Sequence, residues 1–151
     1  MISDRRLRTA WTIVLMLLML ILPAISVAGD EASIGLGYTE RSMAFKEYEN
    51  SQNSQGEIKY LIKLVKFSNM RIVKAGKEFN STQAARYLLL KLKTTKQDIL
   101  STEQFIDEFA SVTPNGEPIY IIDRKGMNYP ARHVLYSELR RLRNQKSANA
   151  R

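Results

Sequence analysis

The sequence predicts an α+β domain in which about four helices pack with a small antiparallel sheet made of hairpins. Helical stretches and short β-prone runs follow one another without the regular strand–helix alternation that a parallel sheet requires. Glycine-containing turns interrupt the β-prone runs, which is typical of hairpins. The 151 residues include no cysteine, so an apolar core must hold the domain together without disulfides.

The N-terminal residues have the three parts of a secretory signal peptide. Arginines precede an uncharged apolar run over residues 10–22, and Pro23 ends that run. Small residues follow, and we expect signal peptidase to cleave between Ala28 and Gly29. An uncleaved anchor is the alternative, since the uncharged stretch over residues 9–29 could nearly span a bilayer. In both cases we expect the domain outside the cytoplasm, either periplasmic or secreted, or held at the membrane by a single span.

Four segments are expected along the chain. Residues 1–28 form the signal peptide, 29–53 a flexible linker, 54–146 a single α+β domain and 147–151 a disordered tail. The linker is predicted because glycines begin it and Asn, Ser and Gln end it, and such tracts bury too little apolar surface to offset their ordering entropy. A short helix over residues 40–49 that docks on the domain or on a partner is left open.

An amphipathic helix over residues 54–67 is expected to begin the domain. Ser54 and Glu57 have the spacing of a capping box, in which each satisfies a backbone N–H at the helix start. Apolar residues recur along one face at helical spacing. The opposite face carries three lysines: Lys59, Lys63 and Lys66.

A hairpin and a second helix are expected next. Residues 70–79 form two β-prone runs around Ala75–Gly76, a pair suited to a tight hairpin turn. Either Asn80 or Ser81 then caps a helix over residues 82–93, because short polar side chains accept hydrogen bonds from the first free N–H groups.

The C-terminal half is expected to add two helices and two more strands. Ser101 caps a third helix over residues 102–110. Residues 119–123 form a compact apolar strand, and residues 127–129 return as a short strand. Pro130 fits the first turn of the last helix. The apolar positions of that helix are Ala131, Leu135, Leu139 and Leu142.

From Glu57 to Leu142, this chain resembles a family of short exported bacterial proteins known only as a domain of unknown function. The segments that carry the resemblance are EIKYLIKLVKFS, RIVKAGKEF, QAARYLLLKLK, TEQFIDEFAS, NGEPIYII and VLYSELRRL. The resemblance implies export and this fold, and it implies no activity or ligand. Many members carry a cysteine at two positions where this chain has Met70 and Asp123, so the resemblance implies no disulfide or redox role here.

The sequence contains no recognisable catalytic constellation. His133 is the only histidine, which excludes a multi-histidine metal site, and the missing cysteines exclude thiol nucleophiles and cysteine-held zinc. No glycine-rich phosphate loop is present. Asp107 and Glu108 are adjacent on a predicted helix and therefore point in different directions. We expect no catalytic residues, metal or cofactor, and a hydrolase that uses two carboxylates remains an alternative.

Two groups of cations make anionic partners the best remaining prediction. The formal net charge is +8, which favours anionic surfaces through long-range attraction. The first group is Lys59, Lys63 and Lys66, and the second, at the end of the last helix, is Arg140, Arg141 and Arg143 with Lys146. The alternative is that both groups are solvated faces, because helix faces are usually charged without a dedicated ligand. No aromatic residues interleave with the cations, so nucleic acid is not expected.

The predicted function is therefore that of an exported, non-enzymatic binding or interaction domain. Its partner would be an envelope protein or an anionic lipid, and contact with the membrane itself would come only through the signal segment if that segment is not cleaved. The alternatives are a small cell-envelope hydrolase that uses carboxylates and a protein that binds anionic lipid surfaces.

Overall fold

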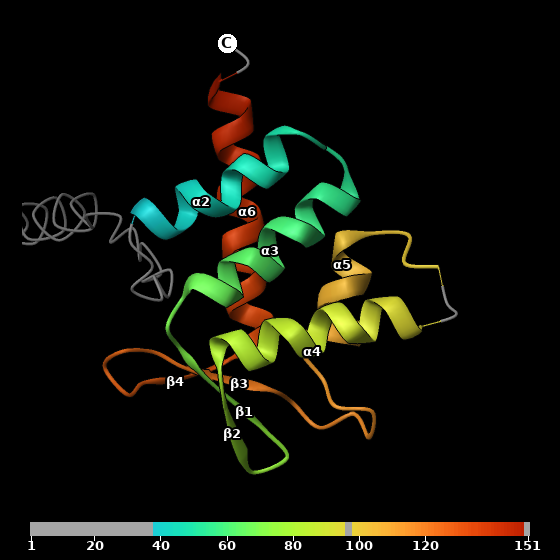
Figure 1. The fold of residues 1–151 in the computed structure, drawn as a ribbon, viewed down its shortest axis with the longest axis vertical. Helices are drawn as coiled ribbons and strands as arrows, with labels where there is room; N and C mark the ends of the chain where they lie inside the picture. Colours follow the sequence, from blue (N-terminus) through green and yellow to red (C-terminus); the bar gives the residue numbers. More distant parts are fainter. Residues whose placement is uncertain (1–37, 96–97, 150–151) are drawn as a thin grey trace, which may run out of the picture. The chain divides into compact units, whose positions relative to one another are not determined.

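The computed structural model describes residues 38–95 and 98–149, and these residues form an α+β fold (Figure 1). Within these residues, five α-helices, one of them very short, accompany a four-stranded antiparallel sheet, which confirms the predicted fold class. The predicted signal peptide, its cleavage site at Ala28 and Gly29, and the first part of the predicted linker lie outside the described residues. Within residues 38–95 and 98–149, none of the helices has the length and apolarity that crossing a membrane requires.

The elements follow one another in an order close to the predicted one. They are α2 (Tyr38–Glu49), α3 (Ser54–Phe67), β1 (Arg71–Lys74), β2 (Lys77–Asn80), α4 (Ser81–Thr94), α5 (Thr102–Gln104), the π-helix η1 (Phe105–Ala110), β3 (Tyr120–Ile122), β4 (Asn128–Pro130) and α6 (Ala131–Asn149). The sheet order is β2-β1-β3-β4, with every neighbouring pair antiparallel. β1 is therefore a central strand that pairs with both β2 and β3.

Asparagine side chains cap the starts of α3 and α4. The predicted cap of α3 was Ser54, but Asn53 occupies the cap position and its Oδ1 accepts from the backbone N of Gly56 at 3.0 Å. Asn80 caps α4 in a full capping box: its Oδ1 accepts from the N of Gln83 at 2.8 Å, and Gln83 accepts in return from the N of Asn80 at 3.0 Å. Each asparagine satisfies a donor that the first helical turn leaves free.

The β1–β2 hairpin turns at Ala75–Gly76, as predicted. Ala75 has φ 49° and Gly76 has φ 70°, and positive φ at both central residues is the requirement of a type I′ turn. The turn sets the register in which Lys74 lies opposite Lys77 and Ile72 opposite Phe79. Across the other edge of β1, Ile72 lies opposite Ile121, and both are buried.

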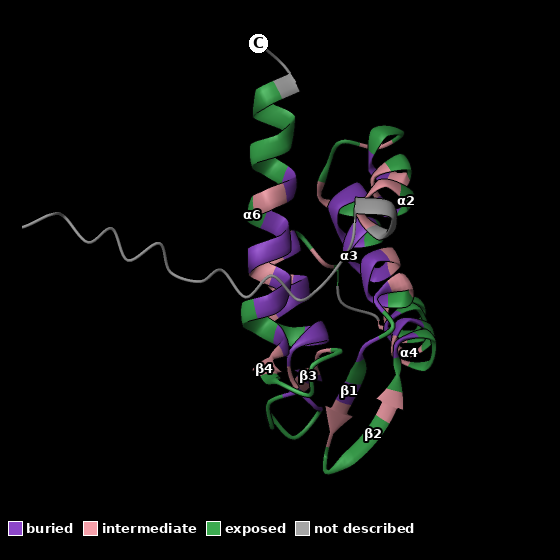
Figure 2. Ribbon diagram, turned by 90° about the vertical axis from the view of Figure 1, so that its left-hand side faces the viewer, coloured by how far each residue is buried: buried purple, intermediate pink, exposed green. Residues whose placement is uncertain are grey.

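The core lies between α3, α6 and the α5–η1 segment. Figure 2 shows buried residues along α3 and the first part of α6, whereas the last turns of α6 are exposed. The side chains that fill the centre include Ile58, Leu61, Leu64, Phe105, Ile106, Leu139 and Leu142. Burial of each such side chain stabilises the fold by about 1.5–3 kcal/mol.

The third predicted helix is regular only over its first turn. The hydroxyl of Ser101 accepts from the N of Gln104 at 3.0 Å, which confirms the predicted cap. From Phe105 to Ala110 the segment is π-helical, with bonds that join residues five apart rather than four. The four apolar residues of this segment are all buried. The spacing of apolar residues in the sequence does not distinguish a π-helix from an α-helix, so the π-helix was not predicted.

The structure corrects the predicted flexible linker over residues 38–49. These residues form α2, which packs along α3 and places Ala44 and Tyr48 in the core, where they are 0% and 2% exposed. Nη2 of Arg41 also lies 3.0 Å from Oε1 of Glu138 on α6. The sequence had left open a docked helix over residues 40–49 as an alternative. The structure has such a helix, α2.

Two expectations about the last helix also change. Pro130 does not lie in its first turn but ends β4, where it pairs with Tyr120. β4 is an edge strand, and an edge tolerates a residue without an N–H donor. α6 continues to Asn149, so most of the tail expected to be disordered, residues 147–151, is helical. The hydroxyl of Ser147 donates to the carbonyl of Arg143 at 3.1 Å within this last stretch.

Candidate functional site

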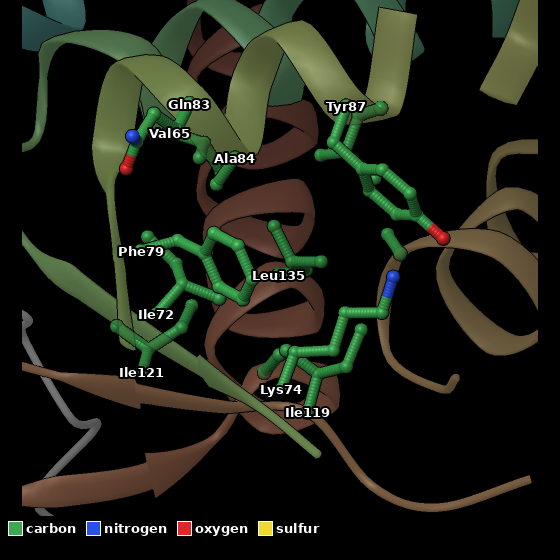
Figure 3. A pocket seen from close by; sticks show the side chains of 13 residues that line it. Val65, Ile72, Lys74, Phe79, Gln83, Ala84, Tyr87, Ile119, Ile121 and Leu135 are labelled. Carbon is green, nitrogen blue, oxygen red and sulfur yellow. The ribbon is translucent and has the colours of Figure 1, made fainter. Parts of the chain in front are cut away.

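An apolar pocket opens between α4 and the sheet (Figure 3). Its volume is about 330 Å³, which lies at the lower end of the roughly 300–1,000 Å³ of ligand pockets. Its walls come from α3, α4, β1, β3 and α6, which are distant in sequence. The deep, buried lining residues include Val65, Ile72, Leu88, Ile119, Ile121 and Leu135.

The less buried lining residues mark the mouth of the pocket. They are Lys74, Phe79, Ala84 and Tyr87, which are half-buried, and Gln83, which is exposed. These residues lie on β1, β2 and α4, so the pocket opens between the hairpin and that helix. A ligand that entered here would meet polar groups first and apolar walls beyond them.

Two local periodicities place these side chains. Lys74 is two residues after Ile72 on β1, and side chains two apart on a strand share one face of the sheet. Along α4, Gln83, Ala84, Tyr87 and Leu88 follow helical spacing and form a single stripe toward the sheet. The strand therefore contributes one ammonium group to the pocket, and the helix contributes one phenol.

The amine of Lys74 lies over the ring of Tyr87. Its Nζ is 3.6 Å from the ring centroid, within the range of a cation–π interaction (Figure 3). One helical turn beyond Tyr87, Nζ of Lys91 donates to the carbonyl of Phe109 at 3.0 Å. Partial burial lowers the pKa of the Lys91 amine, Tyr87 acts against this shift, and the positive charge of Lys74 adds a smaller lowering effect. The two amines are therefore close enough to repel each other.

Among the described residues, neither Lys74 nor Lys91 has a carboxylate in an ion pair. Lys77 lies directly across the hairpin from Lys74 and is exposed. Residues opposite each other on paired strands point to the same face of the sheet, so Lys77 lies on the same face as Lys74. The described lining of the pocket is thus mostly apolar, and its one charged residue is Lys74. Lys77 is the neighbour of Lys74 across the hairpin, and Lys91 is near enough to interact with its charge.

The predicted lysine group on α3 is partly engaged by α2. Nζ of Lys63 lies 2.8 Å from Oε1 of Glu47, and this contact lowers the pKa of the Glu47 carboxyl. Lys66 lies near the ring of Phe67, with Nζ 5.5 Å from the centroid, and Lys59 is exposed. The three lysines share a face as predicted, but Lys63 acts in the docking of a neighbouring helix.

The predicted arginine group on α6 does not form one surface. Arg143 is bound by Glu57 and Glu103, and Nη1 of Arg141 lies 3.5 Å from the buried carboxylate of Glu138. Arg140 is exposed. Arg141 and Arg143 are therefore held by carboxylates of the domain itself, which leaves less positive charge for an external anion than the sequence suggested.

Arg143 joins two carboxylates from different elements. Its Nε and Nη2 each donate to Glu57 at 2.8 Å, and its Nη1 donates to Glu103 at 2.7 Å. Burial raises the cost of ionising Glu57, but hydrogen bonds from Arg143 and Thr102 outweigh it and lower the pKa of that carboxyl. The hydrogen bond from Arg143 likewise lowers the pKa of Glu103. Both acids are therefore ionised at neutral pH.

Acidification is expected to weaken the fold through Glu57. A carboxyl with a lower pKa in the folded chain stabilises the fold fully above its unfolded value, 4.5, and this stability is lost as the pH falls through the lower folded value. We expect Glu57→Gln to remove part of this acid sensitivity, measured as the free energy of unfolding in urea at neutral and acidic pH. Glu49→Gln, at an exposed position of α2, is the control. An unchanged pH dependence in Glu57→Gln would contradict the assignment.

The described residues offer little for hydrolytic chemistry. Glu57 and Glu103, the two acids that Arg143 brings together, are poor proton donors because both pKa values are lowered. Asp107 accepts from the hydroxyl of Tyr136 at 3.1 Å and pairs with Arg132 at 3.0 Å. His133 is exposed on α6. Within the described part of the chain, no group of three potential metal ligands is present.

The pocket residues were missed by sequence reasoning because they come from separate elements. A partial signal did exist on α4, where Tyr87 and Lys91 are four apart and follow the apolar stripe. Nothing in the sequence indicates that Lys74 comes close to them, because this contact depends on how the hairpin packs against the helix.

One comparison with known proteins matches a family to part of the chain. A family model described as a family of unknown function, DUF5329, matches residues 52–143. Searches of curated proteins and of solved structures found no match. The matched residues run from just before α3 into α6 and include all the described residues that line the pocket, whereas α2 lies outside them.

Proposed function

The chain belongs to the DUF5329 family, whose description states no activity, and we propose that the protein is an exported, non-enzymatic binding domain whose apolar pocket receives part of an envelope component. The observation that carries this proposal is the pocket of about 330 Å³ between α4 and the sheet. Its described lining residues include no carboxylate, so they provide no pair of carboxylates for hydrolysis. Export rests on the N-terminal segment of the sequence.

Binding through the basic helix faces is supported less well. Lys63, Arg141 and Arg143 already contact carboxylates of the domain, and an anionic lipid or acidic protein would have to compete with them. The pocket, in contrast, offers apolar surface that a ligand would remove from water.

Pocket binding is tested with the neutral fluorophore N-phenylnaphthylamine, whose emission rises in an apolar site. We expect saturable binding to the protein as recovered from cells. Ala84→Phe places a ring in the mouth of the pocket. It is expected to weaken fluorophore binding by about tenfold or more, because the ring occupies space that the fluorophore needs.

The matched control for this experiment is Leu90→Phe. Leu90 lies on the same helix, is 58% exposed and does not line the pocket. Equal affinity in both variants, or no binding to the unchanged protein, would contradict the proposal. Export is tested by the mass of the species in the envelope fraction, where a chain that begins at Gly29 is expected and an uncut cytoplasmic chain would contradict export.

A further inference from the structure

We propose that the pocket binds a single-chain amphiphile with an anionic head group, with the head at Lys74 and Lys91 and the hydrocarbon chain against the apolar walls. This inference deepens the proposed function and rests on it. It names the chemistry of the ligand, and either a carboxylate or a phosphate head would supply that chemistry.

The rim of the pocket supplies the argument for an anionic head. Lys74 lines the mouth, Lys77 lies opposite it across the hairpin, and Lys91 is close enough to Lys74 for the two charges to interact. None of the three lysines has a carboxylate partner among the described residues. Partly buried ammonium groups that repel one another are costly without a counter-charge. An anion placed between them would relieve that cost and gain charge-assisted hydrogen bonds.

The positions of the two nearest amines suit a head group at the mouth. Lys74 is half-buried, and its Nζ contacts the ring face of Tyr87, an interaction it can exchange for a hydrogen bond to an anion. Lys91 uses its Nζ to donate to the carbonyl of Phe109, and an ammonium group has two further donors. Both amines can therefore bind an anion without breaking an ion pair.

The interior supplies the argument for a single hydrocarbon chain. The deep walls are formed by aliphatic side chains such as Ile72, Ile121 and Leu135. A polar group along the ligand would be left without a hydrogen bond there, which is unfavourable. A volume of about 330 Å³ is small among ligand pockets, which favours one chain over two.

The test is displacement of bound N-phenylnaphthylamine by dodecanoate, dodecyl phosphate and dodecanol. We expect both anions to displace the fluorophore at lower concentration than dodecanol does, and added salt to reduce this preference. Comparison of dodecanoate with dodecyl phosphate then tells which head group is preferred.

Lysine variants test the assignment of the head-group site. Lys74→Met keeps the apolar stem and removes the charge, and it is expected to weaken dodecanoate binding by about tenfold more than it weakens dodecanol binding. Lys91→Met is expected to act in the same direction, and Lys74→Arg to retain binding. Lys93→Met and Lys125→Met, at exposed positions that do not line the pocket, remove the same charge and serve as controls.

The outcomes separate this inference from the proposed function. Fluorophore binding with equal affinities for dodecanoate and dodecanol would overturn the anionic head while leaving the pocket as a binding site. An equal loss in Lys74→Met and Lys93→Met would show that only net charge matters and would also overturn it. Absence of fluorophore binding would contradict the proposed function itself.

Discussion

Replacing Tyr48 with alanine is expected to lower the free energy of unfolding by about 3–5 kcal/mol, the usual cost of truncating a large buried ring. Tyr48 is 2% exposed and packs into the core from α2, with its ring centroid 5.8 Å from that of Phe45. The truncation removes apolar contacts and leaves a space that α2 and α3 can close only in part. Urea unfolding followed by circular dichroism measures the loss.

Met43→Ala is the matched control for this experiment. Met43 lies on the same helix and is 47% exposed, so its truncation should change stability by no more than about 0.5 kcal/mol. If both variants unfold at the same urea concentration as the unchanged protein, α2 is not part of the cooperative fold. A loss confined to Tyr48→Ala would place this segment in the core.

Gly56→Ala is expected to destabilise the protein by about 3 kcal/mol, at the upper end of the cost of overpacking. Alanine normally stabilises a helix relative to glycine by about 0.5–1 kcal/mol, so the sign of the change is itself informative. At this position a Cβ would overlap the backbone carbonyl oxygen of Ser51, which accepts from the N of Asn53 in the turn between α2 and α3. The turn would have to open, and α2 would shift with it.

Gln55→Ala provides the comparison for the glycine variant. Gln55 lies in the same helical turn and is exposed, so alanine should be neutral or slightly stabilising there. Thermal unfolding of the two variants under the same conditions gives the difference. A Gly56→Ala protein as stable as Gln55→Ala would mean that α2 does not approach α3 as closely as the structure indicates.

The elements with strong local signals were predictable from the sequence. α3 and α4 have apolar stripes at helical spacing, and α4 has its asparagine cap. The pair Ala75–Gly76 indicated a tight turn, and the structure has the positive φ angles that this turn requires. In each case the deciding interactions lie within a few residues of one another, so the sequence alone contains them.

The elements that depend on distant contacts were not predictable. α2 lacks a continuous apolar stripe, and its docking depends on Ala44, Tyr48 and an ion pair from Arg41 to Glu138, a residue 97 positions away. The candidate pocket needs Lys74 and Tyr87 from two separate elements, and no spacing in the chain links them. The arginines of α6 looked like a surface group because their carboxylate partners, such as Glu57, come from elsewhere.

The docking of α2 has a practical consequence for the smallest fragment that will fold. The residues shared with the family, 52–143, would be the natural choice for recombinant expression, yet that choice discards α2. Without α2, the core loses Ala44 and Tyr48, which pack against α3. The carboxylate of Glu138, which is 1% exposed, also loses its ion pair with Arg41. A soluble, well-behaved fragment for crystallography or ligand screening should therefore begin no later than residue 38.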